Sequence, residues 1–178
     1  MGLDLSLPLL RLARRSETPP FLLVRADMRR LPFRDASFSA VTSFFTSFGY
    51  FAAKAEDVEV AREIRRVLGA GGRFLLDYLN AAQVRAGLVP EEALELDGAS
   101  VHVTRSIEGD AVVKQIRITS GQGGPPSEHQ ERVRLYAPDE LERLLASAGL
   151  VTTDRFGDYE GARFAPASGR LVLAGHAE

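Results

Sequence analysis

The chain has 178 residues, 45% of them hydrophobic, and a formal net charge of -2, which suits one globular domain with a sizeable core. It contains no cysteine, which excludes disulfides, zinc–thiolate sites and thiol nucleophiles and favours a reducing, cytoplasmic location. The charge gives no basic face for nucleic acid, and no apolar run approaches the roughly 18 residues of a membrane span. We therefore expect a small-molecule partner, no nucleic acid and no membrane.

Two short strands are predicted near the start, each followed by an acid. Gly2-Leu3-Asp4 resembles the end of a strand, with Ser6 placed to cap a short helix. After the loop 16–20, residues 21–24 form a continuous apolar strand that leads into Asp27. Carboxylates at strand ends can accept hydrogen bonds from ribose hydroxyls or an exocyclic amine, and Asp77 and Asn80 share this placement further on. Spacing alone allows equally that Asp4 and Asp27 cap the turns that follow them.

Residues 40–51 (AVTSFFTSFGYF) form the central stretch of the chain. Its first half is β-branched and aromatic, which predicts a strand covered on both faces. The loop from Ser47 to Tyr50 follows where the chain leaves the sheet, and ligands of open α/β sheets lie beyond such strand ends. The phenylalanines 44, 45, 48 and 51 are each interpreted as core residues.

A strand–helix–strand unit follows. Glu56 and Asp57 lie in the first turn of a predicted helix whose apolar residues repeat at helical spacing up to Leu68, and the glycines 69, 71 and 72 end it. Residues 73–78 form the next strand. Strand, helix and strand in this order predict a parallel crossover and an α/β fold.

Residues 94–136 alternate apolar and polar side chains, which predicts antiparallel strands that cap the main sheet. Arg132 and Arg134 lie on the last of them and could hold an anionic acceptor, but alternating charge on such a strand favours their interpretation as part of a solvated face. His129, on the same strand, is the histidine best placed to act as a base if its side chain faces the crevice. A helix opened by Pro138 and two further strands, at 150–153 and 171–174, complete the chain.

Four segments carry a resemblance to a known family. They are GLDLS at 2–6, RADMRRLPF at 25–33, FTSFGYF at 45–51 and RVLGAGGRFLLD at 66–77. In wording and order they look like successive motifs of class I S-adenosylmethionine (SAM)-dependent methyltransferases, in the branch that acts on small molecules. The resemblance covers nearly the whole chain and implies a Rossmann-like methyltransferase sheet, as one domain over 1–178, with 94–136 as an inserted antiparallel cap.

The resemblance also implies roles for individual residues. Asp4 would hold the ribose hydroxyls of SAM, Asp27 its adenine amine, and Met28 would pack on the adenine ring. Tyr50 would face the substrate, and the cap would cover the acceptor pocket. The methionine part of the cofactor would be lined by the residues of the loop after the central strand, Phe45, Thr46 and Ser47.

The resemblance departs from the family at the N-terminus. The family's first strand and its glycine-rich loop would lie before Met1, so we expect a truncated, incomplete sheet and self-association of the protein as a homodimer through its open strand edges. The expected function is in-line methyl transfer from SAM to a small molecule. The alternative is a non-catalytic relic of the fold that serves as a binding or dimerising module. A nucleic-acid methyltransferase fits poorly, because the central strand is not followed by an Asn-Pro-Pro-aromatic or Asp-Pro-Pro-aromatic tetrapeptide.

Overall fold

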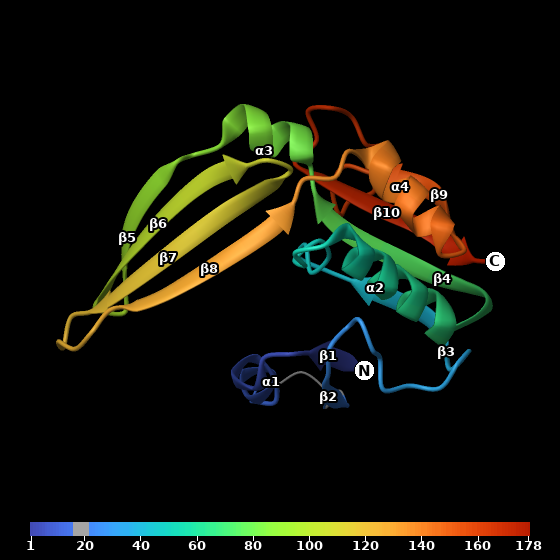
Figure 1. Ribbon diagram of the computed structural model, residues 1–178, viewed down its shortest axis with the longest axis horizontal. Coiled ribbons are helices and arrows are strands. Elements are labelled where there is room, and N and C mark those ends of the chain that lie inside the picture. Colours follow the sequence, from blue (N-terminus) through green and yellow to red (C-terminus); the bar gives the residue numbers. More distant parts are fainter. Residues whose placement is uncertain (16–21) are drawn as a thin grey trace.

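The computed structural model describes residues 1–15 and 22–178, so the predicted loop 16–20 and the predicted start of a strand at Phe21 lie outside the described residues. The strands group into three sheets (Figure 1). The first sheet pairs β1 (Gly2–Asp4) with β2 (Leu23–Arg25), in parallel. The second has the order β3 (Phe38–Ser43), β4 (Leu68–Leu79), β10 (Arg170–Ala177), β9 (Leu150–Phe156). The third has the order β5 (Glu91–Leu96), β6 (Ala99–Glu108), β7 (Ala111–Ser120), β8 (Ser127–Arg134).

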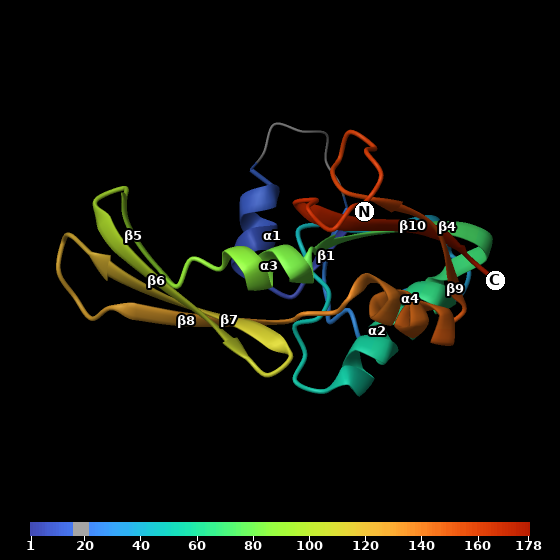
Figure 2. The same ribbon diagram turned by 90° about the horizontal axis from the view of Figure 1, so that it is seen from above.

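The second sheet forms the α/β body of the molecule. β3 and β4 are parallel and α2 (Lys54–Val67) joins them, which confirms the predicted crossover. β10 runs antiparallel to both β4 and β9. The helices α2 and α4 (Pro138–Ser147) lie on the same face of this sheet in both views (Figures 1 and 2). This is the Rossmann-like architecture that the sequence predicts.

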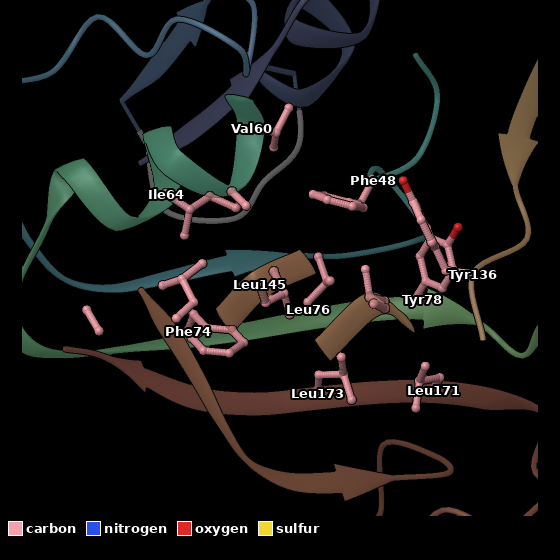
Figure 3. Packing of buried hydrophobic residues seen from close by; sticks show 14 of the residues in the cluster. Phe48, Val60, Ile64, Phe74, Leu76, Tyr78, Tyr136, Leu145, Leu171 and Leu173 are labelled. Atoms are coloured by element: carbon pink, nitrogen blue, oxygen red, sulfur yellow. The ribbon is translucent and has the colours of Figure 1, made fainter. Parts of the chain in front are cut away.

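The core lies between those two helices and the sheet (Figure 3). Val60 and Ile64 of α2 and Leu145 of α4 pack toward Leu76 of β4 and Leu173 of β10, and all five are at most 9% exposed. The i, i+4 spacing on α2 therefore marks its buried face, as expected for an amphipathic helix.

The first sheet is separate from the second. Within the part of the chain that the structure describes, β1 and β3 each pair along one edge only. Ser39, Ala40 and Thr42 of β3 are exposed, so the prediction of a central strand covered on both faces is wrong. The β-branched composition identified the strand correctly. Composition does not show whether a second strand pairs with it or whether other elements cover both of its faces. α1 (Leu7–Ala13) follows β1, and Ser6 caps it by accepting the Leu9 N–H, as predicted.

The third sheet, which we call the cap sheet, projects from the body as a curved wing (Figures 1 and 2). Its four strands are antiparallel throughout, as the alternation predicts. The short helix α3 (Ala81–Gly87), which the sequence did not predict, connects β4 to it, and Asn80 caps this helix by accepting the Ala82 N–H at 3.1 Å. The division of the chain into one domain with a cap at 94–136 stays a prediction.

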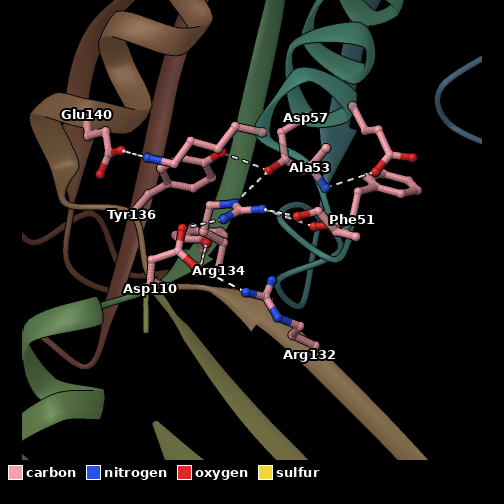
Figure 4. Close-up of polar contacts among 12 residues, drawn as sticks. Phe51, Ala53, Asp57, Asp110, Arg132, Arg134, Tyr136 and Glu140 are labelled. Atoms are coloured by element: carbon pink, nitrogen blue, oxygen red, sulfur yellow. Dashed lines mark hydrogen bonds and ion pairs between the residues drawn. The ribbon is translucent and has the colours of Figure 1, made fainter. Parts of the chain in front are cut away.

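A buried polar cluster joins the cap sheet to the body (Figure 4). Arg134, at the end of β8, is 4% exposed and faces the fully buried Asp57 of α2 across 3.3 Å. Tyr136 donates to the same Asp57 oxygen at 2.7 Å. The interpretation of Arg134 as part of a solvated face is therefore wrong, because α2 and the 51–52 backbone cover this end of the strand. Burial raises the pKa of Asp57, although its bonds to Tyr136 and Arg134 act in the opposite direction.

Candidate functional site

The turn after β3, residues 44–47, has an unusual backbone. Phe45 and Thr46 adopt φ angles of 56° and 59°, the left-handed region that non-glycine residues rarely occupy and that a β-branched residue such as Thr46 finds especially unfavourable. Phe44 and Phe45 are 43% and 79% exposed. Their interpretation as core residues is wrong, because the strand ends at Ser43 and the turn directs them outward. For Phe48, which is 1% exposed, the same interpretation is confirmed.

Asp77 of β4 holds this turn. Its Oδ2 accepts the Phe45 N–H at 2.6 Å, and its backbone oxygen accepts the Thr46 N–H at 3.2 Å. The carboxylate is fully buried and also accepts from Tyr159 at 2.7 Å and from Arg170 at 2.8 Å. The position of Asp77 at a strand end suggests a carboxylate that accepts from a ligand's hydroxyl or amine, but in the structure it accepts from donors of this protein.

A cavity of about 590 Å³ lies between the first and second sheets. We call it the β1–β3 cavity. Its walls are mainly apolar and come from the two facing strands, from α2 and from the turn after β3. Met28, Phe45 and Ser47 line it on the side where the strands end. The placement beyond strand ends, at an interruption of the sheet, is where α/β proteins bind ligands.

A second cavity, of about 540 Å³, lies between the cap sheet and the segment around α3. We call it the cap cavity. Thr46 lines it from the body, Val84 and Leu88 from the α3 side, and Val112 and Val133 from the cap sheet. The turn 44–47 therefore contributes to both cavities, with Phe45 in one and Thr46 in the other.

The charged residues of the cap cavity form two pairs. Arg105 binds Glu92 at 2.8 Å, and Lys114 lies 3.4 Å from Glu131. Reasoning from sequence missed all four, because they are ordinary charged residues on alternating strands. The available signal was the alternation of side chains along the cap strands. In the registers Arg105↔Lys114 and Lys114↔Glu131, these three residues lie on the same face of the cap sheet.

The two acids predicted to hold SAM both make local turn contacts. Asp4 accepts the Ser6 N–H at 2.7 Å. Asp27 accepts the Arg29 N–H at 2.9 Å and pairs with its guanidinium at 2.6 Å, which lowers the pKa of Asp27. The capping interpretation thus describes real contacts of both residues. Both are half-buried at the ends of β1 and β2, so a ligand role stays a prediction.

Neither of the predicted acceptor-side residues, Tyr50 and His129, is among those that line the cap cavity. Tyr50 is 42% exposed, and burial together with the nearby charge of Glu131 raises its pKa. His129 is exposed on β8 opposite Ile116 and is not among the residues that line the cap cavity. Glu131, two positions further on the same strand, does line it.

Comparison with known proteins identifies similar sequences and folds. A family model described as a methyltransferase domain matches residues 1–76. A dTDP-3-amino-3,6-dideoxy-alpha-D-glucopyranose N,N-dimethyltransferase of Streptomyces fradiae is 31% identical over 157 residues, which cover 84% of this chain. The chain spans only 60% of the length of that relative.

Solved structures establish the fold. A SAM-dependent methyltransferase from Clostridium acetobutylicum has a TM-score of 0.84 at 19% identity, over 98% of this chain and 73% of that one. The sugar N-methyltransferase KedS8 from Streptoalloteichus has a TM-score of 0.73 at 21% identity, over 99% of this chain and 70% of that one. Among the described residues, no helix is long and apolar enough to cross a membrane. With the match of residues 1–76 and the curated relative, these likenesses show that the chain has the class I SAM-dependent methyltransferase fold.

Proposed function

We propose that the protein binds SAM beside the turn 44–47 and transfers its methyl group in line to an amine of a small sugar-like molecule held in the cap cavity. The observation that carries the proposal is the shared wall: Phe45 lines the β1–β3 cavity and Thr46 the cap cavity. Donor and acceptor bound on opposite sides of one turn can meet, and methyl transfer depends mainly on such alignment. The amine and the sugar come from the curated relative and are extended to this chain as part of the proposal.

The residues at the strand ends fit the cofactor chemically. Asp4 and Asp27 do not line the β1–β3 cavity themselves, but they lie at the ends of the strands β1 and β2 beside it and would supply carboxylate acceptors for ribose hydroxyls and an adenine amine. Met28 and Phe45 supply apolar, polarisable surface for the adenine and the thioether part. When bound, SAM supplies a sulfonium-activated methyl group. The protein's own part is to hold the acceptor nitrogen in line and to receive a proton from it.

The cap cavity suits an uncharged sugar amine. Most of its lining is aliphatic, and its four charged side chains form two neutral pairs. Lys114 beside Glu131 opposes protonation of an amine there, and only the neutral amine has the lone pair that attacks a methyl group. We assign acceptor contact to Glu131, which lines the cap cavity and replaces His129 as the proposed base. Tyr50 does not line this cavity, but the charge of Glu131 reaches it, so its proposed role is at the rim of the acceptor site.

Calorimetric titration with S-adenosylhomocysteine (SAH) tests the cofactor half of the proposal. We expect micromolar binding, weakened about tenfold, or ~1.4 kcal/mol, in Asp4→Asn by loss of the charge facing the ribose. Asp35→Asn is the matched control, because the Asp35 side chain is 79% exposed and remote from the turn 44–47. Absence of heat at millimolar SAH would favour the alternative, a non-catalytic binding or dimerising module.

Self-association and location belong to the same proposal. β1 and β3 present unpaired edges among the described strands, so we propose that the chain without SAM forms a homodimer by strand pairing at one of them, which SAM in the β1–β3 cavity would displace. The reaction is assigned to the cytoplasm. Transfer of a labelled methyl group from SAM to dTDP-3-amino-3,6-dideoxyglucose tests the acceptor half.

A further inference from the structure

We propose that Asp77 and Tyr159 are positioning residues, which hold the turn 44–47 in its left-handed conformation and thereby align the two cavities for methyl transfer. The inference rests on the proposed function, since it gives a role to the wall that the cavities share. Neither residue is among those that line either cavity. Asp77 is also fully buried, so its effect on a ligand must pass through the residues that it binds.

The turn needs an external hold. Two consecutive non-glycine residues in the left-handed region are each energetically unfavourable, and such a backbone persists only where its surroundings impose it. Phe45 is 79% exposed, so burial of its ring contributes little. Within the turn, Ser47 donates to the Phe44 oxygen through its N–H and its hydroxyl. From outside the turn, the Phe45 N–H donates to the Asp77 carboxylate, the Thr46 N–H donates to the Asp77 backbone oxygen, and Arg170 donates to the Thr46 hydroxyl at 3.3 Å.

Tyr159 completes this set from a distant part of the chain. It lies in the loop between β9 and β10, 82 residues from Asp77, and donates to the same Oδ2 that accepts the Phe45 N–H. Its ring is 55% exposed and stacks 5.5 Å from the Arg170 guanidinium. A half-exposed tyrosine adds little to core packing. The contribution that we expect of its hydroxyl is therefore the hydrogen bond to Asp77 at the turn. Tyr159→Phe therefore removes the bond to Asp77 and keeps the ring on Arg170.

The position of the turn 44–47 determines how the two cavities are aligned. A shift of the turn displaces Phe45 and Thr46 together, and so changes the position of both cavities at the point where they meet. Misplacement of reacting groups by about 1 Å can cost a hundredfold in rate. Loosening the turn should therefore reduce the rate of the bound complex more than it reduces the affinity for either ligand.

The test combines amide exchange with kinetics in Tyr159→Phe and Asp77→Asn. In Tyr159→Phe we expect about tenfold faster hydrogen exchange at the Phe45 and Thr46 amides, and kcat lowered about tenfold with KM and the Kd for SAH within about threefold. Asp77→Asn should change the same quantities further. Tyr136→Phe is the matched control: it removes a hydroxyl bound to Asp57 at the cap junction, and should lower stability while leaving exchange at the turn unchanged.

The outcomes separate this inference from the proposed function. Unchanged exchange at Phe45 and Thr46 in Tyr159→Phe overturns the inference whatever the activity, and so does a rise in KM at constant kcat. If the wild-type chain binds no SAH and transfers no methyl group, the proposed function fails and the alignment role fails with it. Faster exchange in that case would still show that Asp77 and Tyr159 hold the turn.

Discussion

Glu131 and His129 lie two positions apart on β8 and on the same face of the cap sheet, but only Glu131 is among the residues that line the cap cavity. We expect Glu131→Gln to lower kcat by about a hundredfold, the lower end of what a general base contributes, because the amide cannot accept a proton from the acceptor. Methyl transfer to dTDP-3-amino-3,6-dideoxyglucose measures it. Glu128→Gln is the control, since Glu128 is exposed on the same strand and pairs with Arg117 at 3.7 Å. Equal rates in the two variants would contradict the role.

The choice between these two residues shows what a sequence can and cannot predict about this site. Alternation on β8 predicts that positions 129 and 131 share a face, and it selects the histidine by residue type alone. It does not predict how far each position lies from the body, which depends on where the cap sheet joins α3 and the turn 44–47. Asp77 is similar: its place at a strand end was predictable, but its partners Tyr159 and Arg170 come from the far end of the chain.

Arg134 gives a prediction about stability. Arg134→Met should lower the free energy of unfolding by about 3–5 kcal/mol, because it leaves Asp57 as an uncompensated charge in the interior. Asp57 Oδ1 already has no hydrogen-bond partner in the described structure, so little else is present to compensate. Urea denaturation measures the change. Arg117→Met, at an exposed ion pair of the cap sheet, should change stability by less than about 1 kcal/mol. Similar losses of unfolding free energy in both variants would show that the buried pair contributes no more to stability than the exposed pair.

At the scale of elements, α2 holds the segment before β3 through two side chains. Glu63 accepts the Leu31 N–H at 2.6 Å, and Arg66 donates to the Leu31 oxygen at 2.9 Å and the Phe33 oxygen at 2.7 Å. The two side chains also bind each other at 2.6 Å. The proline at 32 keeps this segment out of any sheet, so side chains of the helix satisfy backbone groups that strand pairing would otherwise satisfy.

This contact should make stability depend on pH. The hydrogen bond from Arg66 lowers the pKa of Glu63 below its usual 4.5. A lowered folded-state pKa contributes stability that is present above the unfolded value and is lost as pH falls through the folded value. We expect Glu63→Gln to be about 1–2 kcal/mol less stable than wild type at pH 7, with the difference shrinking below about pH 4.5. Urea titrations between pH 3 and pH 7 measure it. Glu59→Gln, exposed on the same helix, should show no such convergence.

Long elements with a sustained apolar pattern were predictable from the sequence. A short helix, and the exposure of a strand that pairs along one edge only, were not. The apolar spacing of α2 and the alternation of the cap strands mark buried faces that the structure confirms. α3 has seven residues, with one of them buried, so its sequence carries too few apolar repeats to reveal it. For β3, the residue types predicted a strand correctly. They did not predict that Ala40 and Thr42 are exposed, because residue types do not show that β3 has one partner strand among the described residues.

At the scale of the whole molecule, three sheets meet around two cavities, and several strand edges face solvent. Outer edges lie on β2, β5, β8 and β9, whereas β1 and β3 face each other across the β1–β3 cavity. Apolar edges favour pairing with another chain, and charged edges oppose it. β5 carries three glutamates, Glu91, Glu92 and Glu95, whereas β3 (FSAVTS) carries no charge. Of these two, β3 is therefore the edge expected to pair with a second copy.

Light scattering at micromolar concentration tests this expectation. We expect the wild-type chain without SAM to run as a dimer and Ala40→Lys to run as a monomer, because a lysine at this exposed position of β3, which also lines the β1–β3 cavity, adds a charge where a second strand would pair. Ala93→Lys places the same charge on an exposed position of β5 and should leave the dimer intact. A monomeric wild type would contradict self-association itself. Dissociation by Ala93→Lys but not by Ala40→Lys would instead move the interface to the cap sheet, away from the turn that both cavities share.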